Sequence, residues 1–233
     1  VISYAASLLC LWMIRPVPPA EGADPPSVAA VIEGFRYARS RQELIGTYVV
    51  DFVAMVFGMP LALFPAVSDR LGGPSVLGLL YAAPAVGALA ASLTSQWTPH
   101  VHRHGLAVML AATVWGLAIV GFGYCETLWP ALAYLAIAGG ADGISGIFRA
   151  TMWNETIPDA LRGRLASIEM VSYMSGPLLG HLEAGAVAAM FGVAASVVSG
   201  GALCVVGVLA CGICLPRFVR YDARQFRAAG STR

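Results

Sequence analysis

Residues 105–124 read GLAVMLAATVWGLAIVGFGY, a stretch of twenty residues with no charged side chain, and 193–215 repeat the pattern as VAASVVSGGALCVVGVLACGICL. A helix needs about 20 mostly apolar residues to cross the hydrocarbon core of a bilayer. The chain holds six runs of this kind, separated by short polar hinges: 44–67, 75–97, 105–124, 128–151, 165–190 and 193–215. The pattern predicts an all-α membrane protein, a bundle of six transmembrane helices.

The composition agrees with a chain that lies mostly in lipid. Hydrophobic residues make up 58% of it, charged residues 12%, and the mean hydropathy is +0.74. Soluble domains carry roughly 25% charged residues. The 26 glycines suit helices that pack closely inside a membrane. A net charge of +1 gives no sign of a nucleic-acid partner, so we expect the lipid bilayer to be the main surroundings.

Four segments follow from these patterns. Residues 1–14 are apolar but too short to span, and we interpret them as the end of a truncated transmembrane helix. Residues 15–43 begin with prolines, then place apolar residues on one face, which predicts a cytoplasmic linker with a short amphipathic helix. Residues 44–215 form the six-helix bundle, and 216–233 form a basic cytoplasmic tail.

The arginines give the orientation. If the six helices alternate, the linker, the loop before residue 105, the loop at 156–164 and the tail all lie on one side. The other side carries only Arg70, beside Asp69, and Glu126. Because basic residues accumulate on the cytoplasmic side of membrane proteins, we expect both ends of the chain to be cytoplasmic.

Ionisable residues inside a membrane helix are costly and are therefore functional candidates. Asp51 lies about 10 Å and Asp142 about 14 Å from the same face, at 1.5 Å per residue. Asp142, Ser145 and Arg149 follow the i, i+3, i+7 spacing and share one helix face. We predict that Asp51, Asp142, Ser145 and Arg149 line a substrate or proton pathway, or that the carboxylates are structural and paired with a neighbour.

A second set lies nearer the cytoplasmic side. Glu169 is about 6 Å below that interface, within reach of Arg149. Arg162 and Arg164 flank Gly163 in the predicted turn. We predict that Arg162, Arg164 and Glu169 form a cytoplasmic gate; the alternatives are a static ion pair for Glu169 and simple anchoring for the two arginines.

Gly176, Pro177 and Gly180 stand in the middle of the fifth run. A proline frees a backbone carbonyl and bends a helix, and glycines permit close approach. The element predicts a helix bend that takes part in transport. The alternative is that these residues serve only helix packing.

Several stretches resemble the major facilitator superfamily, in its enterobactin exporter-like, transmembrane secretion effector branch. They are EGFRY at 33–37, LIGTYVVD at 44–51, MPLALFP at 59–65, TIPDALRGR at 156–164 and SGPLLG at 175–180. The resemblance implies the C-terminal half of a twelve-helix fold. One departure is the loop 96–104, which lacks the acidic residue of the superfamily signature and makes a charge-relay gate there doubtful.

The resemblance further implies a secondary active transporter of the bacterial cytoplasmic (inner) membrane. Its partners would be a small-molecule substrate, protons, and either a missing N-terminal six-helix half or a second copy of the chain. Aromatic and methionine side chains at mid-membrane positions favour a siderophore, drug or similar amphipathic solute. We expect no cofactor and no metal.

Two other functions remain open. The first alternative is that this single six-helix half does not transport and is a truncated membrane fragment or a structural subunit. An intramembrane serine protease would use the GISG motif at 143–146 with His181, but Ser145 and His181 differ in depth by about 15 Å in straight helices. We therefore predict that the protein is not an enzyme.

Overall fold

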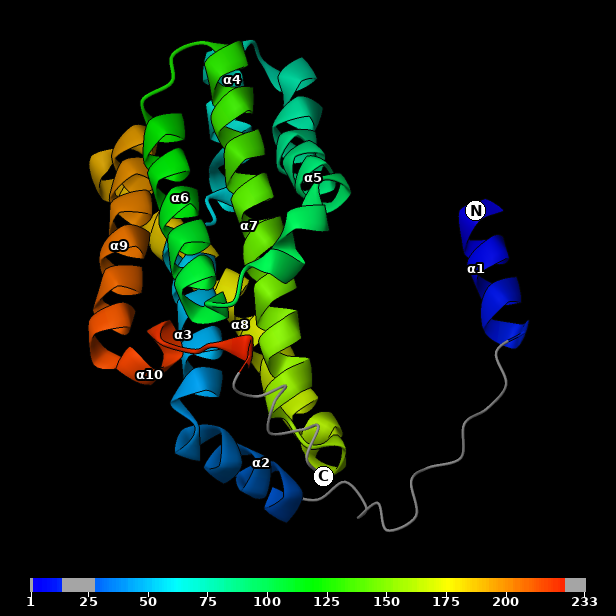
Figure 1. The fold of residues 1–233 in the computed structure, drawn as a ribbon. Coiled ribbons are helices and arrows are strands. Elements are labelled where there is room, and N and C mark those ends of the chain that lie inside the picture. Colours follow the sequence, from blue (N-terminus) through cyan, green and yellow to red (C-terminus); the bar gives the residue numbers. More distant parts are fainter. Residues whose placement is uncertain (1, 14–27, 225–233) are drawn as a thin grey trace.

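The computed structural model describes residues 2–13 and 28–224, and all regular structure in this part of the chain is helical (Figure 1). Residues 1, 14–27 and 225–233, which hold the prolines of the predicted linker and the last part of the tail, lie outside the described residues. The elements are α1 (Ile2–Met13), α2 (Val28–Ser40), α3 (Gln42–Phe57), η1 (Leu61–Leu63), α4 (Phe64–Leu71), η2 (Pro74–Val76), α5 (Leu77–Leu93), η3 (Ser95–His100), α6 (His104–Gly123), α7 (Leu128–Thr156), α8 (Asp159–Phe191), α9 (Val193–Cys214) and α10 (Pro216–Val219).

Each predicted run corresponds to a helix or to a helix with a short break. Five described segments are long and apolar enough to cross a membrane: Gln42–Leu71, Pro74–Leu93, His104–Gly123, Leu128–Thr156 and Val193–Cys214. The sixth, α8, has 33 residues and a length of about 50 Å. It is more polar than the others because it carries Glu169, His181 and Glu183. The chain is an all-α, multi-pass membrane protein.

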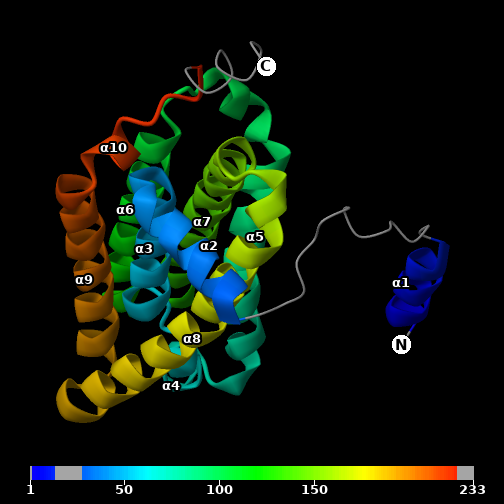
Figure 2. The ribbon, with the colours of Figure 1, turned by 90° about the horizontal axis from the view of Figure 1, so that it is seen from below.

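The helices pack as a bundle with α2 lying across one end, beneath α3 and α8 (Figures 1 and 2). Within the bundle α7 packs on α5 and α6, α6 packs on α9, and α3 packs on α8 and α9. The end that carries α2 and α10 is the predicted cytoplasmic end, called the α2 end below. Helix α1 stands apart from the bundle, with exposed Leu8, Leu9 and Trp12 (Figure 1).

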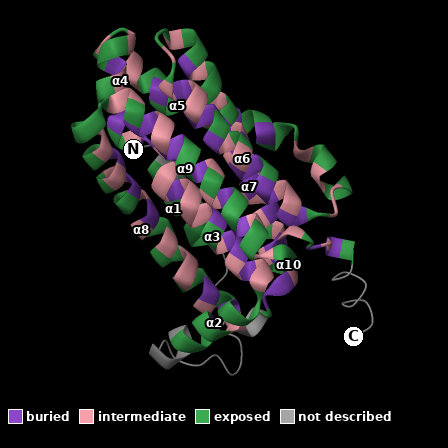
Figure 3. Cartoon of the chain, turned by 90° about the vertical axis from the view of Figure 1, so that its left-hand side faces the viewer, coloured by how far each residue is buried: buried purple, intermediate pink, exposed green. Residues whose placement is uncertain are grey.

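Glycines bring several helices into backbone contact. A Cβ added at Gly87 of α5 would lie 1.8 Å from the carbonyl oxygen of Ala136, and one added at Gly139 of α7 would lie 2.0 Å from that of Pro84. Helices in lipid associate through such close packing of small residues. Exposed residues recur along the outside of the bundle (Figure 3), and many of them are large and apolar, as expected for a surface that meets lipid.

The first run is not one continuous helix. Helix α3 ends at Phe57, and the chain passes through Gly58 and Pro60 before it resumes at η1. A proline disfavours helical conformation at the residue before it, which accounts for the break. The carbonyl freed at Gly58 accepts a hydrogen bond from the Trp115 indole at 2.7 Å.

The turn predicted at 156–164 is shorter than expected. Helix α7 continues to Thr156, and α8 begins at Asp159 directly after the extended Pro158. Arg162 and Arg164 therefore lie in the first turns of α8 and not in a loop, which corrects the sequence interpretation. Pro158 takes the N-cap position with an extended backbone (φ −60°, ψ 145°), so the helix begins directly after it.

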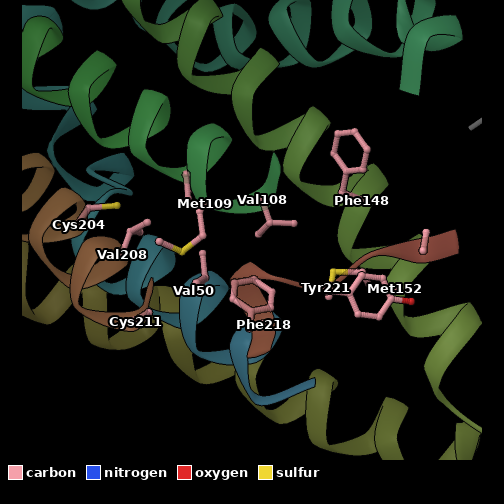
Figure 4. Close-up of a cluster of buried hydrophobic side chains, with 12 residues drawn as sticks. Val50, Val108, Met109, Phe148, Met152, Cys204, Val208, Cys211, Phe218 and Tyr221 are labelled. Atoms are coloured by element: carbon pink, nitrogen blue, oxygen red, sulfur yellow. The ribbon is translucent and has the colours of Figure 1, made fainter. Parts of the chain in front are cut away.

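The tail after α9 docks on the bundle within the described residues. Phe218 of α10 is fully buried in the core cluster that joins α3, α6, α7 and α9 (Figure 4). It fits there because Gly46 and Gly105 have no side chain: a Cβ at Gly46 would lie 2.2 Å from the Phe218 ring. The backbone N–H of Ala223 also donates to His102 O at 3.0 Å.

Polar side chains fix the same contact. The Tyr221 hydroxyl donates to Glu155 Oε2 at 2.9 Å, and His104 Nδ1 lies 3.9 Å from the same oxygen. Burial raises the pKa of Tyr221 well above its usual value, so the phenol keeps the proton that it donates. The first part of the predicted basic tail is thus packed onto the bundle.

Candidate functional site

A polar pocket of 290 Å³ lies between α3, α7 and α8. It is the place where the sequence-predicted residues Asp51, Arg149 and Glu169 meet. Its lining consists of Thr47, Tyr48, Asp51, Gly146, Arg149, Ala150, Trp153, Asn154, Glu169, Ser172 and Tyr173. The pocket occupies the half of the bundle nearer the α2 end, because α3 and α8 both begin at that end.

Arg149 is the centre of the site. Its guanidinium forms an ion pair with Asp51 of α3, and Nη2 lies 3.7 Å from Oδ1 of Asp142, seven residues earlier on α7. The Arg149 and Asp51 side chains are only 14% and 12% exposed, whereas the Asp142 side chain is 48% exposed. The sequence placed Asp51 and Asp142 at a similar depth, and the structure brings both carboxylates to Arg149 in one cluster.

The charges of this cluster do not cancel. One guanidinium faces two carboxylates, so the cluster carries a net charge of −1 when all three groups are ionised. Isolated charge is costly within a membrane, and the addition of one proton to a carboxylate would neutralise the cluster. Arg149 Nε is buried without a hydrogen-bond partner among the described residues, so this N–H donor of the guanidinium makes no hydrogen bond there. The arrangement can accept and release a proton.

Asp142 also borders a second cavity, of 380 Å³, on the far side of the cluster from the α2 end. This cavity is mostly apolar and aromatic; Tyr81 of α5 and Trp115 of α6 contribute to its wall. Asp142 thus lies between two cavities, since it contacts Arg149 on one side and lines the second cavity on the other.

Glu169 lines the polar pocket from α8, but it does not make the pair expected from the sequence. Among the described residues, the ion pairs of Arg149 are with Asp51 and Asp142. The pocket lies between α8 and Arg149, whereas α3 places Asp51 in direct contact with the Arg149 guanidinium. Glu169 therefore adds a further carboxylate to the pocket wall.

Sequence reasoning missed Thr47 and Tyr48, the side chains of α3 that complete the pocket beside Asp51. The Trp153 indole donates to Thr47 Oγ1 at 3.1 Å, and its ring packs on Tyr48 at 5.0 Å. The Tyr48 hydroxyl donates to Leu165 O at 3.4 Å. A signal was present, because Thr47 and Tyr48 precede Asp51 by four and three residues and so share its helix face.

The two predicted gate arginines lie at the α2 end, outside the pocket. Arg164 forms an ion pair with Glu33 and thereby joins α8 to α2. Arg162 donates to the side-chain and backbone oxygens of Asn154, both at 3.4 Å, and Asn154 lines the pocket. Of the predicted gate residues, Glu169 lies in the pocket and Arg162 contacts one of its lining residues.

The glycine–proline element of α8 packs on the end of α3. Gly176 and Gly180 are buried, and a Cβ at Gly180 would lie 2.7 Å from the carbonyl oxygen of Met55. Pro177 lies between them inside the helix. The geometry supports the packing interpretation of these residues, and their part in transport stays a prediction.

The remaining candidates lie on different helices. Ser145 is buried on α7 and lies outside the lining of the cavities described above, and His181 lies on α8, which packs on α2, α3, α9 and η1. His181 Nε2 is buried without a hydrogen-bond partner among the described residues. In the same part of the chain no three His, Cys, Asp or Glu side chains cluster as a metal site would require.

Known proteins resemble this chain over nearly all of its length. A family profile described as transmembrane secretion effector matches residues 1–228. The enterobactin exporter EntS of Escherichia coli O1:K1 / APEC is 27% identical over 205 residues, which cover 87% of this chain and 49% of that protein. The enterobactin exporter EntS of Shigella boydii serotype 18 matches to the same extent.

The chain spans about half the length of these curated relatives. No solved structure matches it.

Proposed function

The chain belongs to the transmembrane secretion effector family of transporters, and we propose that it is the C-terminal half of a proton-coupled exporter of an amphipathic small molecule. The observation that carries this proposal is the Asp51–Arg149–Asp142 cluster, a group with unequal charge inside the membrane-spanning helices. A static packing element has no need of two carboxylates on one guanidinium, because buried charge costs free energy that apolar packing does not.

Proton coupling would use the difference between the two carboxylates. Asp51 is held tightly by Arg149, while Asp142 is 48% exposed and 3.7 Å from the same guanidinium. Asp142 is therefore the carboxylate that exchanges its proton with a cavity. When Asp142 is neutral, Arg149 and Asp51 form a balanced pair; when it is charged, the cluster carries an excess negative charge that favours return of a proton.

The transporting unit would contain twelve helices. Transporters of this architecture place the substrate near the bilayer midplane, at the interface of two structural repeats. Here α8 exposes apolar and aromatic side chains, among them Met170, Tyr173 and Leu178, next to the polar pocket. A second six-helix half, or a second copy of the chain, would cover this face and close the cavity.

The walls of the cavities and the relatives support one class of substrate. Tyr81 and Trp115 line the second cavity, and Tyr173 and Trp153 line the polar pocket. Such walls suit a solute with aromatic and polar parts. The relatives named enterobactin exporter support a siderophore as the first substrate to test.

The orientation would place the α2 end in the cytoplasm of a bacterial inner membrane. Single cysteines introduced at Asn154 and at Asp69 should distinguish the two sides of the membrane. A membrane-impermeant thiol reagent applied outside intact cells should label the cysteine at 69 and not the one at 154. Labelling of residue 154 from outside would contradict the orientation.

The function is tested with this chain and the second half together in proteoliposomes. Efflux of a catechol siderophore should follow an imposed pH gradient and stop when a protonophore collapses it. Residues 1–233 alone, reconstituted in the same lipid, should give no gradient-driven efflux. Gradient-driven export by the monomeric chain alone would refute the twelve-helix unit, and efflux that ignores the protonophore would refute proton coupling.

A further inference from the structure

A cavity larger than the polar pocket lies away from it. It is a groove of 630 Å³ between α5, α6 and α7, and the charge cluster contributes nothing to its lining. Small residues of the three helices, including Ala90, Ala107 and Gly140, leave the hollow, and the exposed side chains of Leu110, Val114 and Ile137 form its sides. The groove is a lengthwise apolar space between membrane-spanning helices.

The groove opens on a different side of α7 from the polar pocket. On α7 its lining includes Ile144, whereas the polar pocket is lined by Gly146 and Arg149. Gly146 is about 200° and Arg149 about 140° around the helix from Ile144, because each residue advances the helix by 100°. The two cavities therefore occupy opposite sides of α7, and an occupant of the groove enters from the bilayer.

The mouth of the groove has a different chemistry from its interior. Trp97, Thr94 and the exposed Arg103 line it where α5 ends and α6 begins, at the α2 end. The chain from 94 to 104 contains His100 and His102 and no acidic residue, so nothing in this segment neutralises the guanidinium. Tryptophan favours the headgroup level of a membrane, and arginine at that level attracts anionic headgroups.

We propose that this groove is a binding site for one anionic phospholipid of the surrounding leaflet. An acyl chain lies along the apolar walls between α5 and α6, and the phosphate lies at Arg103 beside the Trp97 indole. The proposed orientation places this mouth in the cytoplasmic leaflet. The site is separate from the charge cluster, so its occupancy does not depend on the proposed transport function.

The test uses the full chain purified in a mild detergent. The protein is incubated with equal amounts of phosphatidylglycerol and phosphatidylcholine that carry the same acyl chains, and retained lipids are counted by native mass spectrometry. Wild type should retain one phosphatidylglycerol in preference to phosphatidylcholine. Arg103→Gln should reduce that preference about fivefold, the effect of one arginine near a membrane surface.

Two further variants locate the site. Arg220→Gln removes another exposed arginine from the α2 end, outside the groove, and should leave the preference unchanged. Ala90→Phe places a ring into the groove from an exposed position and should reduce retention of both lipids. Equal retention of the two lipids by wild type would overturn the proposal. Retention that neither Arg103→Gln nor Ala90→Phe changes, or that Ala90→Phe alone reduces, would also overturn it.

Discussion

The contact between α5 and α7 and the contact between α3 and α8 are built in different ways. At the first, Gly87 and Gly139 let the two backbones touch over more than a helical turn. At the second, the backbones approach closely at Gly180 beside Met55, and then a polar pocket of 290 Å³ separates the helices around Asp51. The first contact is made by small residues, and the second surrounds charges.

The difference shows where a lipid-embedded bundle can hold ionisable groups. In lipid, helices are held together by van der Waals contact between small residues, so a tightly packed pair leaves no room for a charged side chain and its hydration. Charged groups need a cavity or a partner. The charge cluster therefore lies beside the pocket, while the α5–α7 contact fixes the position of α7, which carries Arg149.

The largest effect on stability is expected at the α5–α7 contact. Gly139→Ala should lower the free energy of unfolding by about 3 kcal/mol, because the new methyl group meets the Pro84 backbone at 2.0 Å and a backbone oxygen cannot rotate away. Gly146→Ala on the same helix is the matched control, since its Cβ meets nothing within 4 Å. Thermal unfolding in detergent measures both. Equal melting temperatures for the two variants would contradict the tight contact.

A smaller loss is expected at the charge cluster. Arg149→Gln should cost about 2 kcal/mol, less than the removal of a partner from a fully buried pair, because the pocket gives Asp51 some access to water. Arg149→Gln combined with Asp51→Asn should recover part of the loss, since the second change removes the uncompensated charge. Strictly additive losses in this double-mutant cycle would mean that the two residues do not interact.

Gly180→Ala tests how well the α3–α8 contact tolerates the same chemical change. Its methyl group would lie 2.7 Å from the Met55 carbonyl oxygen, but the neighbouring pocket lets α8 shift. We expect a loss of about 1 kcal/mol in unfolding free energy, below that for Gly139→Ala. Thermal unfolding in detergent measures this loss. A loss of unfolding free energy as large as that for Gly139→Ala would mean that the two contacts are equally rigid.

The smallest effect is expected where α2 meets α8. Glu33→Gln removes the partner of Arg164, but the Glu33 side chain is 59% exposed, so the change should cost less than about 0.5 kcal/mol. High salt should remove most of the difference between wild type and variant. A shift in melting temperature that exceeds the one for Gly180→Ala would show that α2 holds the bundle together.

The sequence was sufficient for the parts of the fold that depend on hydrophobic length. The apolar runs and the short helix before them follow from composition and periodicity, and helices form at these positions. The depth of Asp51 and Asp142 in the membrane stays a prediction. Family membership agrees with the resemblance in the sequence. The assignment of these residues to a pathway stays a prediction.

Contacts that depend on the rotation of helices were out of reach. The sequence predicted Glu169 as the partner of Arg149, and only the packing of α3 against α7 shows that Asp51 takes that place. The docking of Phe218 on Gly46 and Gly105 joins residues more than a hundred positions apart, and no local pattern marks it. The break at Gly58 was readable from Pro60, but its hydrogen bond to Trp115 was not.

The central claim is that Asp142 is the carboxylate that couples export to protons. The direct measurement is efflux of a fluorescent solute or siderophore under an imposed pH gradient by the assembled twelve-helix transporter. Asp142→Asn keeps the size and removes the charge, so it should abolish gradient-driven efflux with near-normal insertion, while Asp142→Glu keeps part of it. Unchanged gradient-driven efflux in Asp142→Asn would contradict the account and leave Asp51 as the carboxylate to examine.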